Sequence, residues 1–241
     1  MTLETAGPAS GSPYNPGRVL VTGGGSGLGA AVVQAVLAAG GTPVVLDLDI
    51  SRVTGVKAFA VDVADRAAVE AAVTEAAETM DGLDAVVTAA GIDRCGALAD
   101  VPADQWEKVV GVNLFGTVST ARAALPHLVR THGRVVTIAS TLGIKAVADA
   151  TAYCASKFGV IGFSHALAAE TTGRIGVTTI IPGGMKTRFF DDRDEQYKPQ
   201  DDSRLNDPER VAEAILFALS QPKGCEIRQM LIAHEEEGSW P

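Results

Sequence analysis

The sequence predicts an α/β fold: a doubly wound, seven-stranded parallel sheet with helices on both faces. Two observations lead to this prediction. From Arg18 onward, short β-branched runs alternate with alanine-rich stretches of helical periodicity, and a glycine-rich turn follows the first run. At 241 residues the chain can bury one core without disulfides or metals. We expect a single domain over residues 18–241, preceded by a flexible tail rich in glycine and proline over 1–17.

The apolar runs place the expected elements along the chain. Strands are expected at 19–22, 43–47, 57–61, 85–88, 134–139, 176–181 and 227–232. Helices are expected at 28–39, 66–80, 103–131, 150–172 and 208–220. Two stretches interrupt the alternation: residues 50–56 are long enough only for a turn, and residues 186–207 are polar and rich in acids. The second predicts a substrate lid, although a solvated surface loop would have the same composition.

Composition narrows the class of protein. The formal net charge of −9 disfavours nucleic acid and anionic lipid as partners, because both attract a cationic surface. Cys95, Cys154 and Cys225 lie far apart and show no metal-ligand spacing, so neither a zinc site nor a disulfide framework is expected. No apolar stretch reaches the roughly 20 residues that span a bilayer, and the first residues lack the pattern of a secretory signal. We expect a soluble, cytoplasmic protein that acts on a small molecule.

The glycine-rich turn predicts a phosphate-binding site. It joins the strand at 19–22 to the helix at 28–39, and glycines there let backbone N–H groups approach phosphate oxygens at a positive helix end. Asp47 ends the second strand 18 residues after Gly29, near the interval of about 20 at which a carboxylate binds the adenosine ribose in a Rossmann fold. Because this carboxylate would repel a 2′-phosphate, NAD is favoured over NADP. Arg52, close by in sequence, keeps NADP open.

A second cluster of residues predicts acid–base chemistry. Tyr153 and Lys157 are four residues apart and so share one face of the helix at 150–172. A phenol with a pKa of about 10 needs roughly 4 kcal/mol of phenolate stabilisation to become a base near pH 7, and the Lys157 ammonium is expected to supply part of it. Ser140 follows the strand at 134–139, where the carboxyl edge of the sheet opens, and its hydroxyl is placed to hold a reacting oxygen.

Together these residues resemble the short-chain dehydrogenase/reductase family over residues 18 to about 231. The glycine turn is similar to the family's Thr-Gly-x-x-x-Gly-x-Gly at Thr22, Gly23, Gly27 and Gly29. The resemblance implies a catalytic tetrad of Asn113, Ser140, Tyr153 and Lys157. It implies cofactor contacts from Thr22, Gly23, Gly25, Ser26, Gly27, Leu28, Gly29, Asp47, Leu48, Asp62, Val63, Ala89, Ala90, Gly91, Tyr153, Lys157, Pro182, Gly183 and Thr187. The expected substrate pocket consists of Arg94, Ser140, Leu142, Tyr153, Gly184 and Met185.

Two segments depart from the family pattern. Thr88-Ala89-Ala90-Gly91 has a threonine where the family usually has asparagine, and we expect the Thr88 hydroxyl to replace the amide in ordering the strand. The chain end lacks the Asp-Gly-Gly that commonly follows the last strand, which puts the subunit contacts of this end in doubt.

The resemblance implies an NAD(H)-dependent oxidoreductase that interconverts a small secondary alcohol and its ketone. The main alternative is a 3-oxoacyl-carrier-protein reductase, disfavoured because an acidic lid repels an acidic carrier protein. A non-catalytic dinucleotide-binding sensor is the third alternative, but such proteins usually lack the tyrosine or the lysine. A homo-oligomer, tetramer or dimer, is expected through the helices at 103–131 and 150–172. No metal is expected.

Overall fold

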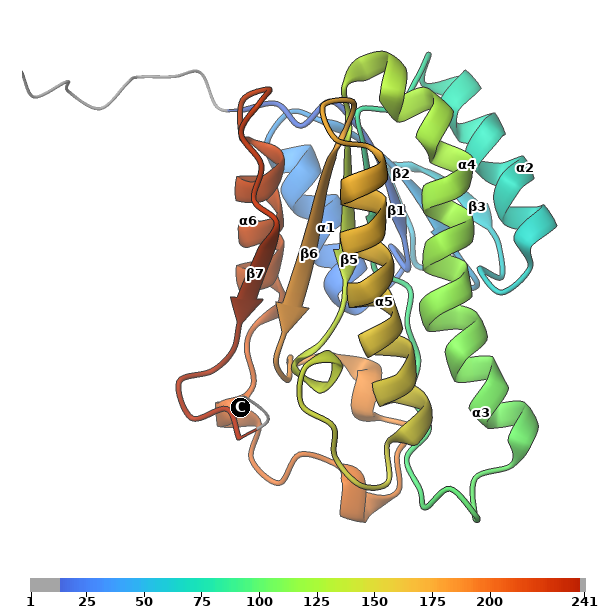
Figure 1. Cartoon of the computed structure of the whole chain (residues 1–241), viewed down its shortest axis with the longest axis vertical. Coiled ribbons are helices and arrows are strands. Elements are labelled where there is room, and N and C mark those ends of the chain that lie inside the picture. The colour runs from blue at the N-terminus through green and yellow to red at the C-terminus, as the bar shows by residue number, and fades with distance from the viewer. Residues whose placement is uncertain (1–13, 239–241) are drawn as a thin grey trace, which may run out of the picture.

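Seven parallel strands form one sheet in a computed structural model that describes residues 14–238 (Figure 1). Their order is β3-β2-β1-β4-β5-β6-β7, so the chain reverses its direction of travel between β1 and β4. This is the doubly wound fold that the sequence predicts. The strands are β1 (Arg18–Thr22), β2 (Thr42–Asp47), β3 (Lys57–Ala60), β4 (Ala85–Thr88), β5 (Arg134–Ile138), β6 (Gly176–Pro182) and β7 (Gln229–Ile232).

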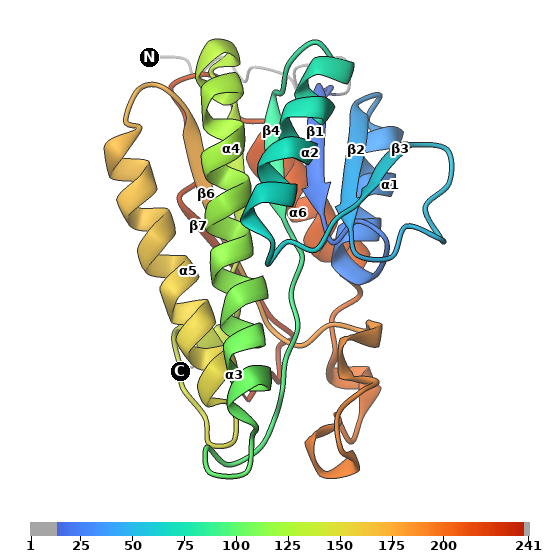
Figure 2. The same cartoon turned by 90° about the vertical axis from the view of Figure 1, so that its right-hand side faces the viewer.

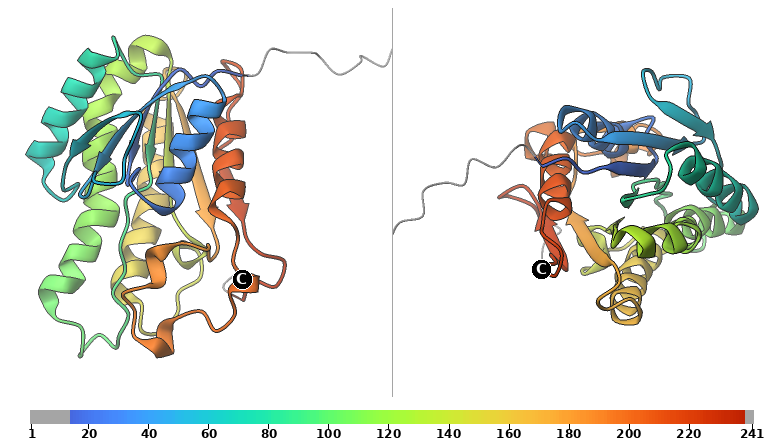
Figure 3. Two further views of the ribbon diagram at one scale, coloured as in Figure 1. Left: turned by 180° about the vertical axis from the view of Figure 1, so that it is seen from behind. Right: turned by 90° about the horizontal axis from the view of Figure 1, so that it is seen from above.

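Helices cover both faces of the sheet, as Figures 2 and 3 show. They are α1 (Gly27–Ala38), α2 (Arg66–Thr79), α3 (Ala103–Val110), α4 (Gly116–Thr131), α5 (Thr151–Glu170) and α6 (Pro208–Leu219). Alternate residues of a strand point to opposite faces, and the core divides accordingly. Leu20 packs in the cluster that contains apolar residues of α2, α4 and α5, whereas Val19 and Val21 pack with α1 and α6.

The long helix expected at 103–131 has an interruption that the sequence does not reveal. Its extent is confirmed, but α3 and α4 are joined by a π-helical turn at Gly111–Phe115. Asn113 lies in this turn, and its side chain bonds with the backbone of Ile92. Insertions of this kind in helices are frequent at functional sites.

The last strand is shorter than expected. It begins at Gln229 rather than at residue 227. Before that point the chain meets β6 through side chains: the Glu226 carboxylate accepts a hydrogen bond from the Val177 N–H, and the Thr178 hydroxyl donates to the Ile227 carbonyl. These bonds replace the backbone ladder, which explains the late start of β7.

The residues just before β1 are bound to the domain. The Asn15 amide donates to the Gly40 carbonyl at 2.8 Å, and the Thr42 N–H donates to the Gly17 carbonyl at 2.8 Å. Residues 15–17 therefore pack with the start of β2, and the domain begins earlier than residue 18. The rest of the expected tail, 1–13, lies outside the described residues.

The strands end at the edge where the functional residues gather. In Figure 1 this edge faces downward, and segment 186–207 lies across it in orange. This segment has no α-helix and contains three 3-10 turns, at Arg188–Phe190, Glu195–Tyr197 and Asp202–Arg204. Within residues 14–238 no helix is long and apolar enough to cross a membrane.

Candidate active site

The glycine turn between β1 and α1 leaves no room for a side chain at Gly23 or Gly29. Gly23 has a φ of +70°, and a Cβ there would lie 2.7 Å from the Ala90 backbone. A Cβ on Gly29 would lie 2.0 Å from the Gly23 carbonyl oxygen. Glycine is therefore required both for the turn and for the close approach of α1 to β1. The result is a cradle of backbone at the start of a helix, which fits the pyrophosphate of a dinucleotide.

Asp47 lies beside this cradle. Its carboxylate accepts hydrogen bonds from the Gly25 N–H at 2.8 Å and from the Asp49 N–H at 3.0 Å. Leu48, the next residue, is largely exposed, while Leu28 is buried in the core below the turn. Ser26 is the N-cap residue of α1, but its side chain forms no capping bond. The predicted ribose contact is therefore next to the predicted phosphate contacts.

Five further residues expected to contact the cofactor lie just after β3 and β4. The Asp62 carboxylate accepts a hydrogen bond from the Ala64 N–H, and Val63 is buried against Gly116 of α4. After β4, the Ala90 N–H donates to the Thr22 hydroxyl at 3.3 Å. Ala89 and Gly91 flank this contact. These predicted cofactor residues thus line the same edge of the sheet as the glycine turn.

Thr88 does not perform the role expected of it. Its hydroxyl is buried and has no hydrogen-bond partner among the described residues. The expectation that it replaces the asparagine amide is therefore wrong. The strand is ordered without it, because Thr88 is in register with Thr22 of β1 and Thr137 of β5 in the backbone ladder.

The predicted catalytic residues come from three elements and meet at one place. Tyr153 and Lys157 lie on α5, Ser140 follows β5, and Asn113 lies in the π-helical turn. All four are buried, and Ser140 is close enough to Tyr153 to act on the pKa of its phenol. The ring of Tyr153 packs in a small cluster with Val109 of α3. The fold therefore brings together residues that are as much as 44 positions apart in the sequence.

Lys157 points its ammonium toward β5. Its Nζ donates to the Ile138 carbonyl at 2.9 Å and lies 5.6 Å from the centre of the Tyr153 ring. Burial lowers the pKa of Lys157 to about 8. The ammonium is thus poorly solvated and near enough to the phenol to act on its charge.

The pKa of Tyr153 is not lowered as the sequence suggested. Burial raises the pKa of this phenol well above its ordinary value, whereas the hydrogen bond to Ser140 lowers it. Two charged residues outside the predicted tetrad act on it in opposite directions: Asp93 raises the pKa and Arg193 lowers it. Because desolvation dominates, a lysine four residues away does not by itself make Tyr153 a base near neutral pH.

Asn113 is held on every side. Its amide nitrogen donates to the Ile92 carbonyl at 2.9 Å and to the Ser156 hydroxyl at 3.0 Å, and its amide oxygen accepts from the Ile92 N–H at 2.8 Å. The side chain therefore fastens the loop after β4 to α5. In the structure, the Asn113 side chain therefore acts directly by positioning this loop.

The segment after β6 returns to the glycine turn. The Gly183 N–H donates to the Ile232 carbonyl, and Pro182 closes the strand. The Thr187 hydroxyl accepts from the Phe189 N–H at 3.3 Å, and its Cβ lies 3.4 Å from the position a Cβ on Gly27 would take. Thr187 therefore lies directly beside the predicted phosphate site.

The predicted substrate-pocket residues divide into two groups. Leu142 packs against the cluster that contains Tyr153, and Gly184 lies against Leu205 of segment 186–207. Met185 instead packs against the sheet core, and Arg94 is exposed. The neighbour of Arg94, Asp93, is the residue that turns inward.

Four residues near the site were missed by the sequence reasoning: Asp93, Phe189, Arg193 and Glu237. Phe189 packs on Tyr153 with ring centres 5.7 Å apart. The Glu237 carboxylate accepts from the Gly184 N–H at 3.0 Å, so the chain end supports the loop after β6. Only Asp93 could have been found from the sequence, because it lies two residues after Gly91, a predicted cofactor contact. The others follow no motif.

Two cavities differ in their relation to these residues. One of about 370 Å³ is lined by Lys186, Thr187, Arg188, Phe190, Lys198 and Leu205, and so belongs to segment 186–207. Another of about 330 Å³ lies between α5, β6 and β7 and includes none of the predicted site residues. Among the described residues, no group of three or more histidine, cysteine or acidic side chains could hold a metal ion.

Comparison with known proteins gives the family. The family model described as short chain dehydrogenase matches residues 17–198. The chain belongs to this short-chain dehydrogenase family. The resemblance inferred from the sequence is therefore confirmed, and with it the class of activity: an oxidoreductase that acts on CH–OH groups.

Related proteins agree with this assignment along most of the chain. An uncharacterized oxidoreductase of Staphylococcus aureus is 32% identical over 225 residues, covering 88% of this chain and 95% of the relative. The 2-(S)-hydroxypropyl-CoM dehydrogenase 3 of Xanthobacter autotrophicus is 31% identical over 229 residues, covering 84% and 89%. A short-chain dehydrogenase of Burkholderia cenocepacia, solved in complex with NADP, is 27% identical with a TM-score of 0.82, covering 92% of this chain and 98% of that one.

Proposed function

We propose that this short-chain dehydrogenase interconverts a small secondary alcohol and its ketone, with NAD as the cofactor and Tyr153 as the acid and base. One observation carries the proposal. The buried Tyr153 phenol lies with Ser140 and the Lys157 ammonium at the sheet edge that also carries the glycine cradle.

Each residue of the site has a distinct task in this proposal. Ser140 donates a hydrogen bond to the substrate oxygen and holds it beside the phenol. Tyr153 takes the hydroxyl proton during oxidation and returns it during reduction. Lys157 stabilises the phenolate through its charge, and Asn113 holds the loop after β4 against α5. A nicotinamide dinucleotide, held by the glycine turn, Asp47 and Thr187, supplies the hydride acceptor or donor.

The surroundings of Tyr153 favour a small or medium-sized substrate. Leu142 and Phe189 offer apolar surface, and Ser140 offers a polar contact. The name of the Xanthobacter relative, a dehydrogenase of a hydroxypropyl compound, supports a secondary alcohol as the reacting group.

A panel of alcohols tests the proposed reaction. The purified chain is mixed with NAD⁺ and 2-butanol, cyclohexanol, glucose or myo-inositol, and NADH formation is followed by absorbance. We expect at least one member of the panel to give turnover that depends on enzyme concentration. Reduction of ketones that requires an acyl carrier protein would instead favour the carrier-protein reductase.

The preference for NAD rests on Asp47. Its carboxylate is at the carboxyl end of β2 and already accepts the Gly25 and Asp49 N–H groups, so its charge faces the region where a ribose would lie. A 2′-phosphate there would meet a negative charge. The NADP in the Burkholderia relative makes NADP the competing candidate.

Replacing Asp47 is expected to change cofactor choice. The parent should bind NADH at least about tenfold more tightly than NADPH, because one unfavourable charge pair costs about 1.4 kcal/mol or more. Asp47→Asn removes the charge and keeps one of the two acceptor oxygens that face the Gly25 and Asp49 N–H groups, so the NADPH affinity should rise about tenfold. Fluorescence titration of both cofactors measures this. Asp49→Asn, which removes an exposed charge two residues away, is the matched control, and equal parental affinities would refute the NAD assignment.

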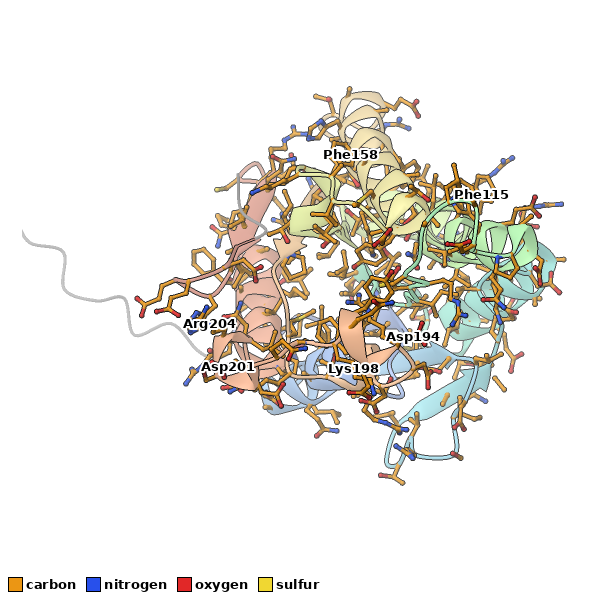
Figure 4. The ribbon with its side chains drawn as sticks, turned by 90° about the horizontal axis from the view of Figure 1, so that it is seen from below. Phe115, Phe158, Asp194, Lys198, Asp201 and Arg204 are labelled. Carbon is orange, nitrogen blue, oxygen red and sulfur yellow. The ribbon has the colours of Figure 1, made fainter. Side chains whose placement is uncertain are left out.

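Self-association through α4 and α5 is the arrangement we propose for the oligomer. Phe115 precedes α4 and is 60% exposed, and Phe158 on α5 is 45% exposed. Figure 4 shows both on the outer side of this pair of helices. Exposed aromatic side chains of this size are common in protein interfaces.

Phe158→Glu is expected to weaken that association. A charge placed in an apolar interface loses its hydration, so the oligomer should dissociate at micromolar concentration. Light scattering measures the mass of the parent and the variant. Phe217→Glu, on α6 at the other face of the sheet, is the comparison variant that distinguishes the two faces; a parent that is itself monomeric contradicts the proposal.

A further inference from the structure

An ion pair joins segment 186–207 to the loop after β4. Arg193 Nη2 lies 2.6 Å from Asp93 Oδ2, and the two side chains are only 16% and 2% exposed. No other ion pair among residues 14–238 buries both partners so fully. Other charged residues of the segment are exposed, among them Asp194, Asp201 and Arg204, which Figure 4 labels.

Arg193 also connects this pair to the catalytic tyrosine. Its guanidinium lies 4.6 Å from the ring centre of Phe190 and 5.4 Å from that of Phe189. Phe189 in turn packs on Tyr153. Nearby, the Tyr197 hydroxyl donates to the Asp149 carboxylate at 3.2 Å, which ties the segment to the residues before α5. The segment is therefore held by contacts that converge on the site.

Stability alone is a poor explanation for this pair. A buried ion pair often contributes little net stability, because both charges lose their hydration. Here the compensation is incomplete, since Arg193 Nε is buried with no hydrogen-bond partner among the described residues. An unpaired buried donor of this kind destabilises the folded state. The effect of this ion pair on the charge of the neighbouring Tyr153 phenol explains its position better.

The charges that face Tyr153 come from several elements. Lys157 and Cys154 lie on its own helix, Asp93 on the loop after β4, and Arg193 on segment 186–207. Asp93 disfavours the phenolate and Arg193 favours it. While Arg193 contacts Asp93, the positive charge of the arginine offsets the negative charge of the carboxylate. If segment 186–207 were displaced, the negative charge of Asp93 would act alone on the Tyr153 phenol.

We propose that Asp93 and Arg193 form a latch that closes segment 186–207 over Tyr153, and that closure offsets the negative charge of Asp93, which otherwise opposes formation of the phenolate. The proposal rests on the catalytic role proposed above for Tyr153. Both residues act through the tyrosine and so are positioning residues. Closure of a segment over a site and completion of its electrostatics are commonly coupled in this way.

The pH dependence of kcat/KM tests the latch, measured with saturating NAD⁺ and the most active alcohol of the panel. Oxidation requires the phenolate, so the rate rises with pH through the pKa of Tyr153. Arg193→Met should move this rise to higher pH by about one unit, which is a tenfold loss at pH 7. Asp93→Asn should move it to lower pH. The double variant should return close to the parent, because neither charge remains.

Control variants distinguish a charge effect from a loss of structure. Arg193→Lys keeps the charge, so its profile should lie near that of the parent. Arg204→Met removes an exposed arginine from the same segment and should leave the profile unchanged. Hydrogen exchange over residues 186–207 should increase in Arg193→Met, which reports opening independently of any substrate.

Two results would overturn the proposal. If Arg193→Met lowers kcat/KM equally at all pH values, the pair is only structural. If exchange over residues 186–207 is unchanged in that variant, Arg193 does not hold the segment. In either case a Tyr153→Phe variant that has lost turnover leaves the proposed function standing, whereas a Tyr153→Phe variant that remains active removes the basis of both.

Discussion

Tyr153→Phe is expected to lower kcat by about 10²–10⁴-fold while the protein still binds NADH. This is the usual contribution of one general acid–base group. Phenylalanine keeps the ring that packs on Phe189 and within the cluster of α3 and α5. What it removes is the hydroxyl that lies near Ser140. The loss should therefore fall on the chemical step.

Three measurements separate this result from a loss of folding. Turnover is measured with the alcohol panel, NADH binding by fluorescence, and folding by circular dichroism during heating. Tyr14→Phe is the matched control, since it removes the hydroxyl of a half-exposed tyrosine just before β1, at the opposite end of the sheet. Turnover retained by Tyr153→Phe would contradict the assignment of the acid and base.

Lys157→Met is expected to abolish most turnover and yet stabilise the fold. Burial lowers the pKa of this lysine to about 8 from an ordinary 10.5, so keeping it charged at pH 7 costs roughly 3 kcal/mol. Methionine removes that cost and loses the hydrogen bond to Ile138, worth about 1 kcal/mol. The free energy of unfolding should rise by about 2 kcal/mol, and Tm by about 4–8 °C. Turnover should fall at least about a hundredfold, because the phenolate loses its cation.

The pH dependence of this stabilisation has a definite sign. Between pH 8 and 10.5 the unfolded parent binds more protons at Lys157 than the folded parent does, so parental stability rises with pH in this window. The advantage of Lys157→Met should therefore be greatest below pH 8 and shrink toward pH 10.5. Thermal unfolding across this range measures it. Lys223→Met, at an exposed lysine after α6, should change neither stability nor turnover; a less stable Lys157→Met would show that the hydrogen bond to Ile138 outweighs the burial penalty of the ammonium.

Local patterns were sufficient for most of the fold. Strands buried on both faces appear as short apolar runs, and the alternation of Val19, Leu20 and Val21 between the two cores is a direct consequence of strand geometry. The glycine turn was equally clear in the sequence. The structure shows why glycine is needed there: a Cβ on Gly29 would collide with the Gly23 carbonyl oxygen. Tyr153 and Lys157 are also a local pattern, since residues four apart share a helix face.

The errors in the site concern contacts between segments distant in the sequence. Asn113, in the π-helical turn, bonds with the backbone of Ile92, which lies 21 residues earlier. The Thr88 hydroxyl was expected to bond and does not, because no partner lies within reach in the packed sheet. The pKa of Tyr153 was expected to be lowered by Lys157, but burial has the larger effect. None of these outcomes follows from a motif.

By itself, the sequence determined the doubly wound sheet, the dinucleotide cradle and the identity of the tyrosine–lysine pair. Each of these depends on residues close together along the chain, where backbone geometry sets which side chains share a face. Only the tertiary structure decided the electrostatic environment of Tyr153. Asp93 and Arg193 are 100 residues apart, and their charges act on the phenol only because folding buries them beside it, where water no longer screens them.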